Sequence, residues 1–252
     1  PRLFLLRGFG IGSLSLTVQF CCAFGFFFIA LQYLQFVVNL SPLVAVCCLL
    51  PMPFVLLPLS RITPRLADRH GFGRIGAIGL ILMAAGFAVF SRLQVDFHYW
   101  IFGVGIVLFA AGMGFAGPPG TTAIVSSLPQ AKQGVASAVN DTTREFGSAL
   151  GIAILGSVLN AAYRSGMEGP TAPLPPEISE KALGSIAFTE YADRLGPAGE
   201  QLAAAARQAF VDGVSRAVIV AAAMLVVTAI VVAAFGPRSA IHAADGALGP
   251  EG

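Results

Sequence analysis

One stretch of the sequence places charged side chains inside an otherwise apolar segment: Asn140, Asp141, Arg144 and Glu145. A helix that starts near Gly134 would bring Arg144 roughly 15 Å along its axis, close to the middle of a bilayer. Charges at that depth are costly and usually face a protein interior or an aqueous cavity. Asn140 and Arg144 share one helix face, and Asp141 and Glu145 share the next. We therefore expect a cavity or gate element here; an internally paired structural cluster is the alternative.

A second polar set lies in the first long apolar segment. Gln32, Gln35 and Asn39 are spaced three and four residues apart, so a helix would place them on one face. Gln19 lies earlier in the same segment. Such a stripe should face a cavity or another polar surface, and we expect these four residues to join Asn140 and Arg144 along a substrate pathway.

Pro118 and Pro119 interrupt a later apolar run. Two prolines remove two backbone donors, so they should kink or break a helix there. The bend could be structural, or it could move or face a cavity, since discontinuous helices are typical of transport sites.

Glycine patterns in two segments favour close helix packing. Gly112–Gly117 matches GxGxxG, but it lies in the middle of a 35-residue uncharged run with no acid before Asp141, which argues against a nucleotide site. Gly147 and Gly151 form GxxxG, typical of membrane helices that approach closely.

The composition explains why charges in these segments are informative. The 252 residues are 56% hydrophobic and only 11% charged, with a net charge of +2 and a mean hydropathy of +0.80. These values exclude a disordered chain, a nucleic-acid module and a typical soluble enzyme. Each apolar run is long enough to cross a bilayer as a helix. We predict an all-α polytopic membrane protein whose six-helix transmembrane bundle uses residues 14–38, 42–59, 75–91, 97–131, 135–162 and 212–237.

The basic residues suggest an orientation. Arg61, Arg65, Arg69 and Arg74 crowd the segment between the second and third spans, which should therefore be cytoplasmic. Six spans then leave both ends of the chain cytoplasmic. The expected divisions are a cytoplasmic leading segment at 1–13, helices 1–5 over 14–162 with a cytoplasmic loop at 61–74, an extracytoplasmic loop at 163–211, a sixth helix at 212–237 and a cytoplasmic tail at 238–252.

Residues for catalysis or metal binding are not grouped in the sequence. The three histidines, His70, His98 and His242, are far apart, and the four cysteines form two adjacent pairs without metal-ligand spacing. We therefore predict no catalytic residue, no metal site, no cofactor and no nucleic-acid partner.

Four stretches together resemble the C-terminal half of a 14-helix drug:proton antiporter of the EmrB/QacA type in the major facilitator superfamily. They are the Tyr-Leu-Gln before the first turn with its Ser-Pro-Leu, the Arg-Leu-Ala-Asp-Arg-His-Gly of the basic segment, the double proline, and the glycine-rich signature that contains Asn140 and Arg144. Their positions are 33–43, 65–71, 118–119 and 134–151.

The resemblance implies proton-coupled multidrug efflux by alternating access in the bacterial plasma membrane, not enzymatic activity. The partners would be a small hydrophobic or cationic substrate, protons, membrane lipid and an N-terminal transporter half that this chain lacks. A non-transporting or truncated six-helix protein, or a membrane-embedded enzyme, is the alternative.

The resemblance also suggests roles in gating and coupling. Asp68 would accept hydrogen bonds from a helix N-terminus in one state only. Arg69 and Arg74 would pair with acids or lipid phosphates. Asp141 and Glu145 are candidate coupling acids, although we favour an acid in the missing half.

Overall fold

The computed structural model describes residues 7–192 and 196–236, and every regular element in this part of the chain is helical. The six predicted spans are present, and all are long and apolar enough to cross a membrane, so the predicted fold class is confirmed. The elements, in chain order, are α1 Arg7–Gln32, η2 Tyr33–Val37, α2 Pro42–Cys47, α3 Pro51–His70, α4 Phe72–Phe90, α5 Tyr99–Ser126, η3 Gln130–Lys132, α6 Gln133–Thr171, α7 Pro176–Gly184, η4 Ile186–Phe188, α8 Thr189–Ala192 and α9 Pro197–Phe235.

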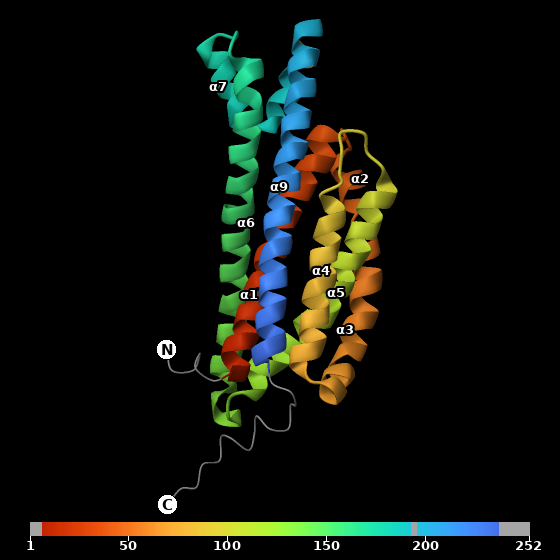
Figure 1. Cartoon of the computed structure of the whole chain (residues 1–252), viewed down its shortest axis with the longest axis vertical. Helices are drawn as coiled ribbons and strands as arrows, with labels where there is room; N and C mark the ends of the chain where they lie inside the picture. The colour runs from red at the N-terminus through yellow and green to blue at the C-terminus, as the bar shows by residue number, and fades with distance from the viewer. Residues whose placement is uncertain (1–6, 193–195, 237–252) are drawn as a thin grey trace, which may run out of the picture.

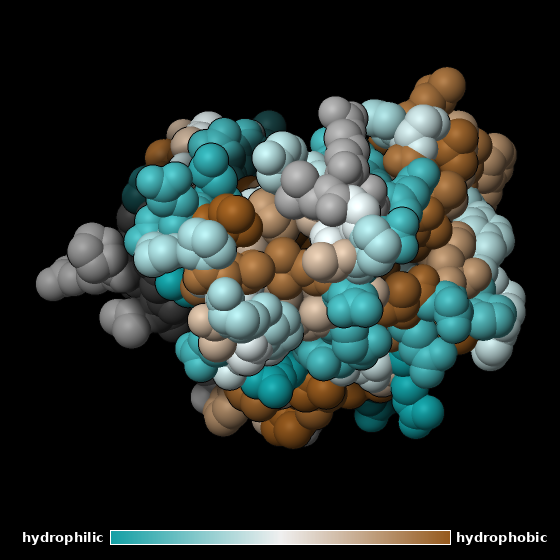
Figure 2. Space-filling model, turned by 90° about the horizontal axis from the view of Figure 1, so that it is seen from above, coloured by the Kyte–Doolittle hydropathy of each residue, from teal (hydrophilic) through white to brown (hydrophobic). Residues whose placement is uncertain are grey.

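The long helices run side by side along one axis (Figure 1). The start of α1 and the end of α9 lie at the same end of the bundle, as six crossings require. At the opposite end α6 and α9 extend beyond the other helices and carry α7. Viewed from that end, the surface mixes hydrophilic residues with hydrophobic patches (Figure 2).

Most helices are longer than the apolar runs predicted. The expected loop at 61–74 is wrong, because α3 continues to His70 and α4 begins at Phe72, with Gly71 alone between them at φ 86°. The expected loop at 163–211 is also wrong, because α6 continues to Thr171 and α9 begins at Pro197. An uncharged run marks only the part of a helix that lies within the bilayer. The helix itself continues into water for as long as its backbone hydrogen bonds continue. The tail at 238–252, and residues 1–6 of the leading segment, lie outside the described residues.

The second span is divided into two helices. Ser41 caps α2, accepting a hydrogen bond at its Oγ from Val44 N, and Pro42 occupies the first turn. The chain then turns at 48–50, and α3 starts at Pro51. The second predicted span, at 42–59, is therefore interrupted, because Pro51 cannot donate the hydrogen bond that would continue α2.

The sequence predicts a kink or a break at Pro118 and Pro119. Helix α5 is continuous through both residues, so the break is wrong and the kink stays a prediction. The hydroxyls of Thr121 and Thr122 donate to the carbonyls of Gly117 and Pro118 and add hydrogen bonds to this turn. Neighbouring side chains and helices commonly support proline within membrane helices in this way.

The predicted close packing at glycine is confirmed. A Cβ at Gly151 would overlap the backbone carbonyl of Cys21 on α1, and one at Gly112 would overlap the backbone of Gly79 and Met83 on α4. At both positions the backbones of two helices touch directly. Phenylalanines from α1, α4 and α5 fill the space beside these contacts, with Phe26 stacked on Phe90 at 4.3 Å between ring centroids.

Replacing Gly151 by leucine should strongly destabilise the bundle, because α1 must move away to accept any side chain. We expect a loss of about 1–3 kcal/mol or more, as for other overpacked cores, measured as a lower unfolding temperature in detergent. Gly134, on the same helix, has no atom within 4 Å of its hypothetical Cβ, so Gly134→Leu is the matched control and should have little effect. Equal effects at the two positions would contradict this role of Gly151.

Candidate functional site

Polar side chains meet where α1, α5 and α6 approach one another inside the bundle. We call the following five residues the polar cluster: Ser15, Gln19, Thr121, Asn140 and Arg144. Three of the five, Gln19, Asn140 and Arg144, were predicted from the sequence as pathway residues. Helix α5 links the two sides: Gln19 Oε1 lies 3.8 Å from the position of a Cβ on Gly117, one turn before Thr121, which binds Arg144.

Arg144 is held by neutral groups. Its Nη2 donates to Thr121 Oγ1 at 2.9 Å, and its Cζ lies 5.0 Å from the centroid of the Phe20 ring. Its Nε is buried and has no hydrogen-bond partner. Within the described part of the chain Arg144 forms no ion pair with Asp141 or Glu145, which are both exposed. Among residues 7–192 and 196–236, no carboxylate therefore compensates this cation.

Gln19 and Asn140 each have an unpartnered acceptor. Gln19 is fully buried; its Nε2 donates to Ser15 Oγ at 2.9 Å, but its Oε1 has no partner. Asn140 donates from Nδ2 to Asp141 Oδ1 at 3.3 Å, and its own buried Oδ1 is also unpaired. Buried acceptors without partners cost roughly 1–3 kcal/mol each. Such groups mark places where water, a ligand or another conformation supplies the missing donor.

The predicted polar stripe on α1 is not kept as one face. The chain forms a π-turn over Tyr33–Val37, and Asn39 leaves the helix with φ 60° and an exposed side chain. The wider turn resets the helical register between Gln32 and the residues that follow it. Gln32 lines a separate cavity near α7, while Gln35 is half-buried.

The predicted gating residues lie at the end of the bundle where α3 meets α4. Asp68 is exposed, and no side-chain hydrogen bond or ion pair links it to any other described residue. The contact with a helix N-terminus, predicted for one state only, is not present among the described residues in this conformation, in which Asp68 projects from the last turn of α3, and it stays a prediction. Arg69 and Arg74 line a cavity of about 490 Å³ that also borders Gly236 at the end of α9.

Sequence reasoning missed two contacts of Arg144, namely Thr121 and Phe20. Both depend on how α1 and α5 pack against α6. The sequence does place Phe20 next to the predicted pathway residue Gln19. That adjacency alone does not predict the contact between the Phe20 ring and Arg144.

Six helices that are long and apolar enough to cross a membrane, with the half-buried Arg144 held between α1, α5 and α6, define a polytopic membrane protein with a polar site between helices. The chain belongs to the Major Facilitator Superfamily, whose sequence profile matches residues 2–152. This is a family of transporters, not enzymes.

The chain is similar to several characterised transporters. It is 33% identical to the multidrug efflux pump LfrA of Mycolicibacterium smegmatis over 210 residues, which are 82% of this chain and 42% of LfrA. It is 27% identical to the methyl viologen resistance protein SmvA of Salmonella typhimurium, covering 91% of this chain and 46% of SmvA. The riboflavin transporter RibZ of Clostridioides difficile is 26% identical over 62% of this chain and 34% of RibZ. The chain thus spans about half the length, or less, of these relatives.

Replacing Gln19 by methionine should leave stability nearly unchanged, because the loss of one hydrogen bond is offset by removing an unsatisfied buried carbonyl. We expect the unfolding temperature in detergent to shift by no more than about 2 °C. Tyr163→Phe is the comparison, since it removes a satisfied bond from the Tyr163 hydroxyl to Ala182 O at 2.8 Å and should cost about 1 kcal/mol. A larger loss for Gln19→Met than for Tyr163→Phe would assign Gln19 a structural role.

Proposed function

We propose that this chain forms the C-terminal half of a proton-coupled exporter that moves small hydrophobic or cationic compounds by alternating access. The observation that carries the proposal is Arg144, which is half-buried and held by Thr121 and Phe20, and which forms no ion pair with any carboxylate among the described residues. The similarity to LfrA and SmvA supports drug or viologen export as the activity.

Because Arg144 has no carboxylate partner in this conformation, a second conformation that supplies one would stabilise its charge. In one state the guanidinium rests on Thr121 and Phe20, as described here. In the other state a carboxylate pairs with it, and the loss or gain of that pair changes the proton affinity of the acid. Asp141 and Glu145 are candidate acids on the same helix, and an acid in the N-terminal half is the one we favour.

A groove beside the polar cluster is the proposed route for substrate. It lies between α1 and α6 and has a volume of about 680 Å³. Its lining combines glycine and apolar side chains with hydroxyl groups, among them those of Ser13, Thr17 and Thr143. Leu14 and Phe146 on its rim are 40% and 58% exposed. In a complete transporter a second bundle would cover these side chains, so the groove would become part of a central cavity that also includes Gln19, Asn140 and Arg144.

The end of the bundle that contains Arg69 and Arg74 is proposed to face the cytoplasm of a bacterial cell. Two more arginines, Arg61 and Arg65, lie on the last turns of α3, and dense positive charge favours that side of the membrane. Asp68, Arg69 and Arg74 would act as gating residues through contacts with the other half or with lipid phosphates.

Arg144→Ala in the complete protein should abolish proton-driven efflux and leave expression intact, because alanine cannot pair with a carboxylate in either state. The measurement is ethidium efflux from energised cells, with collapse of the proton gradient defining the driven component. We expect the driven rate to fall at least about tenfold, equivalent to about 1.4 kcal/mol.

Arg164→Ala is the matched control, since Arg164 is an exposed arginine on the same helix, away from the cluster. Its efflux should equal that of the unaltered protein. Unchanged drug resistance in cells that express Arg144→Ala at normal levels would overturn the proposed role of Arg144.

A further inference from the structure

A second cavity lies near the α7 end of the bundle, well away from the polar cluster. It has a volume of about 400 Å³ and is bounded by α1, α6, α9 and the link between α7 and η4. Gly156 and Asn160 on its α6 wall lie roughly 18 and 24 Å further along that helix than Arg144, at 1.5 Å per residue. This volume falls within the range of sites that hold drug-sized molecules.

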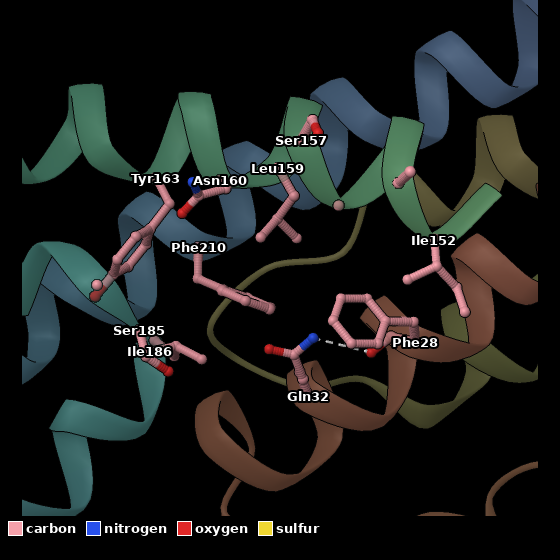
Figure 3. A pocket seen from close by; sticks show the side chains of 13 residues that line it. Phe28, Gln32, Ile152, Ser157, Leu159, Asn160, Tyr163, Ser185, Ile186 and Phe210 are labelled. Carbon is pink, nitrogen blue, oxygen red and sulfur yellow. Dashed lines mark hydrogen bonds between the residues drawn. The ribbon is translucent and has the colours of Figure 1, made fainter. Parts of the chain in front are cut away.

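The cavity wall contains aromatic rings and neutral polar groups. Figure 3 shows Phe28 from α1 and Phe210 from α9 pointing toward each other across the space, with Gln32 and Asn160 on opposite sides. Tyr163 adds a third ring, edge-on to Phe210 at 73° and 6.4 Å between centroids. Of the described residues that line the cavity, none is Asp, Glu, Lys or Arg.

Existing hydrogen bonds determine what the wall can offer a ligand. Gln32 Nε2 already donates to the carbonyl of Phe28 at 3.1 Å, which leaves Gln32 Oε1 as an acceptor. The Tyr163 hydroxyl is committed to Ala182 O, so this residue offers its ring. The Asn160 side chain makes no hydrogen bond within the described part of the chain, and its amide oxygen is a second acceptor.

These groups select by charge. Anions are disfavoured because the wall has no cationic side chain to pair with them, and a doubly charged cation would need a carboxylate that the wall lacks. A flat cation with a single delocalised charge can lie against the aromatic faces while amide oxygens contact its edge. Phe28 is 44% exposed, so the cavity is open on that side and each ring contact adds a modest attraction. Neutral aromatic compounds gain only the apolar part of this contact.

We propose that the cavity between Phe28, Asn160 and Phe210 is a binding site for flat, singly charged aromatic cations, separate from the polar cluster around Arg144. The assignment of these cations as transported compounds rests on the proposed export function, but binding itself does not require transport. The site lies at the end of the bundle opposite the arginine-rich turns, so it would hold a cation before its release or on return.

Direct binding of ethidium to the complete, detergent-purified protein tests the site. Gly156→Leu should weaken ethidium binding at this site at least about tenfold. The Cβ of the new leucine would lie 3.6 Å from Phe28 Cε1, and the rest of its side chain would fill the cavity. Gly103→Leu is the matched control: it faces only the Tyr99 ring at 3.7 Å on α5, does not line this cavity, and should bind normally.

A charge test covers the case in which Gly156→Leu fails to fold. Asn160→Asp keeps the side-chain size and adds a carboxylate at the exposed edge of the cavity, so it should tighten ethidium binding several-fold. Binding of phenanthridine, the neutral ring system, should not change. Unaltered ethidium affinity in Asn160→Asp, or equal tightening for phenanthridine, would overturn the assignment to cations.

Arg144→Ala separates this inference from the proposed function. The variant should lose driven efflux and still bind ethidium in the cavity with normal affinity. Normal ethidium binding in Gly156→Leu would overturn the cavity site and leave the export proposal intact. Normal efflux in Arg144→Ala would overturn the proposed role of Arg144 in export and leave the cavity site intact.

Discussion

The close approach of helix backbones at glycine is the contact on which the rest of this bundle depends. In lipid, burial of apolar surface gives helices little reason to associate, so they rely on van der Waals contact between backbones. At Gly151 on α6 the carbonyl of Cys21 on α1 occupies the space where any other residue would have a side chain. Gly112 allows the same approach between α5 and α4.

The glycine contact between α1 and α6 also positions the polar cluster. Arg144 lies seven residues before Gly151, two turns along nearly the same face of α6, and Phe20 immediately precedes Cys21 on α1. Because the backbones touch at Gly151, the guanidinium is brought to 5.0 Å from the Phe20 ring. A wider helix pair would move the Phe20 ring away from the half-buried Arg144 and expose more of its guanidinium.

The sequence was sufficient to predict the six spans and the close packing at Gly151, because each follows from local composition or spacing. Helix bounds were less accurate, since runs without charge end where lipid ends and not where backbone hydrogen bonding ends. The π-turn after Gln32 has no local signature, so the register of Asn39 could not be foreseen. Within the candidate site, Gln19, Asn140 and Arg144 stood out as polar residues at membrane depth, whereas Thr121 and Phe20 became partners only through the packing of three helices.

The 39-residue length of α6 and of α9 has a mechanical consequence. The last turn of α6 lies roughly 30 Å beyond Gly151 along the axis, at 1.5 Å per residue. If α6 pivots at that contact, a tilt of about 10° displaces the tip by roughly 5 Å, a distance close to one helical pitch. The helix then acts as a lever arm, which converts a small rearrangement around Arg144 into a large displacement of α7 and the short helices beside it.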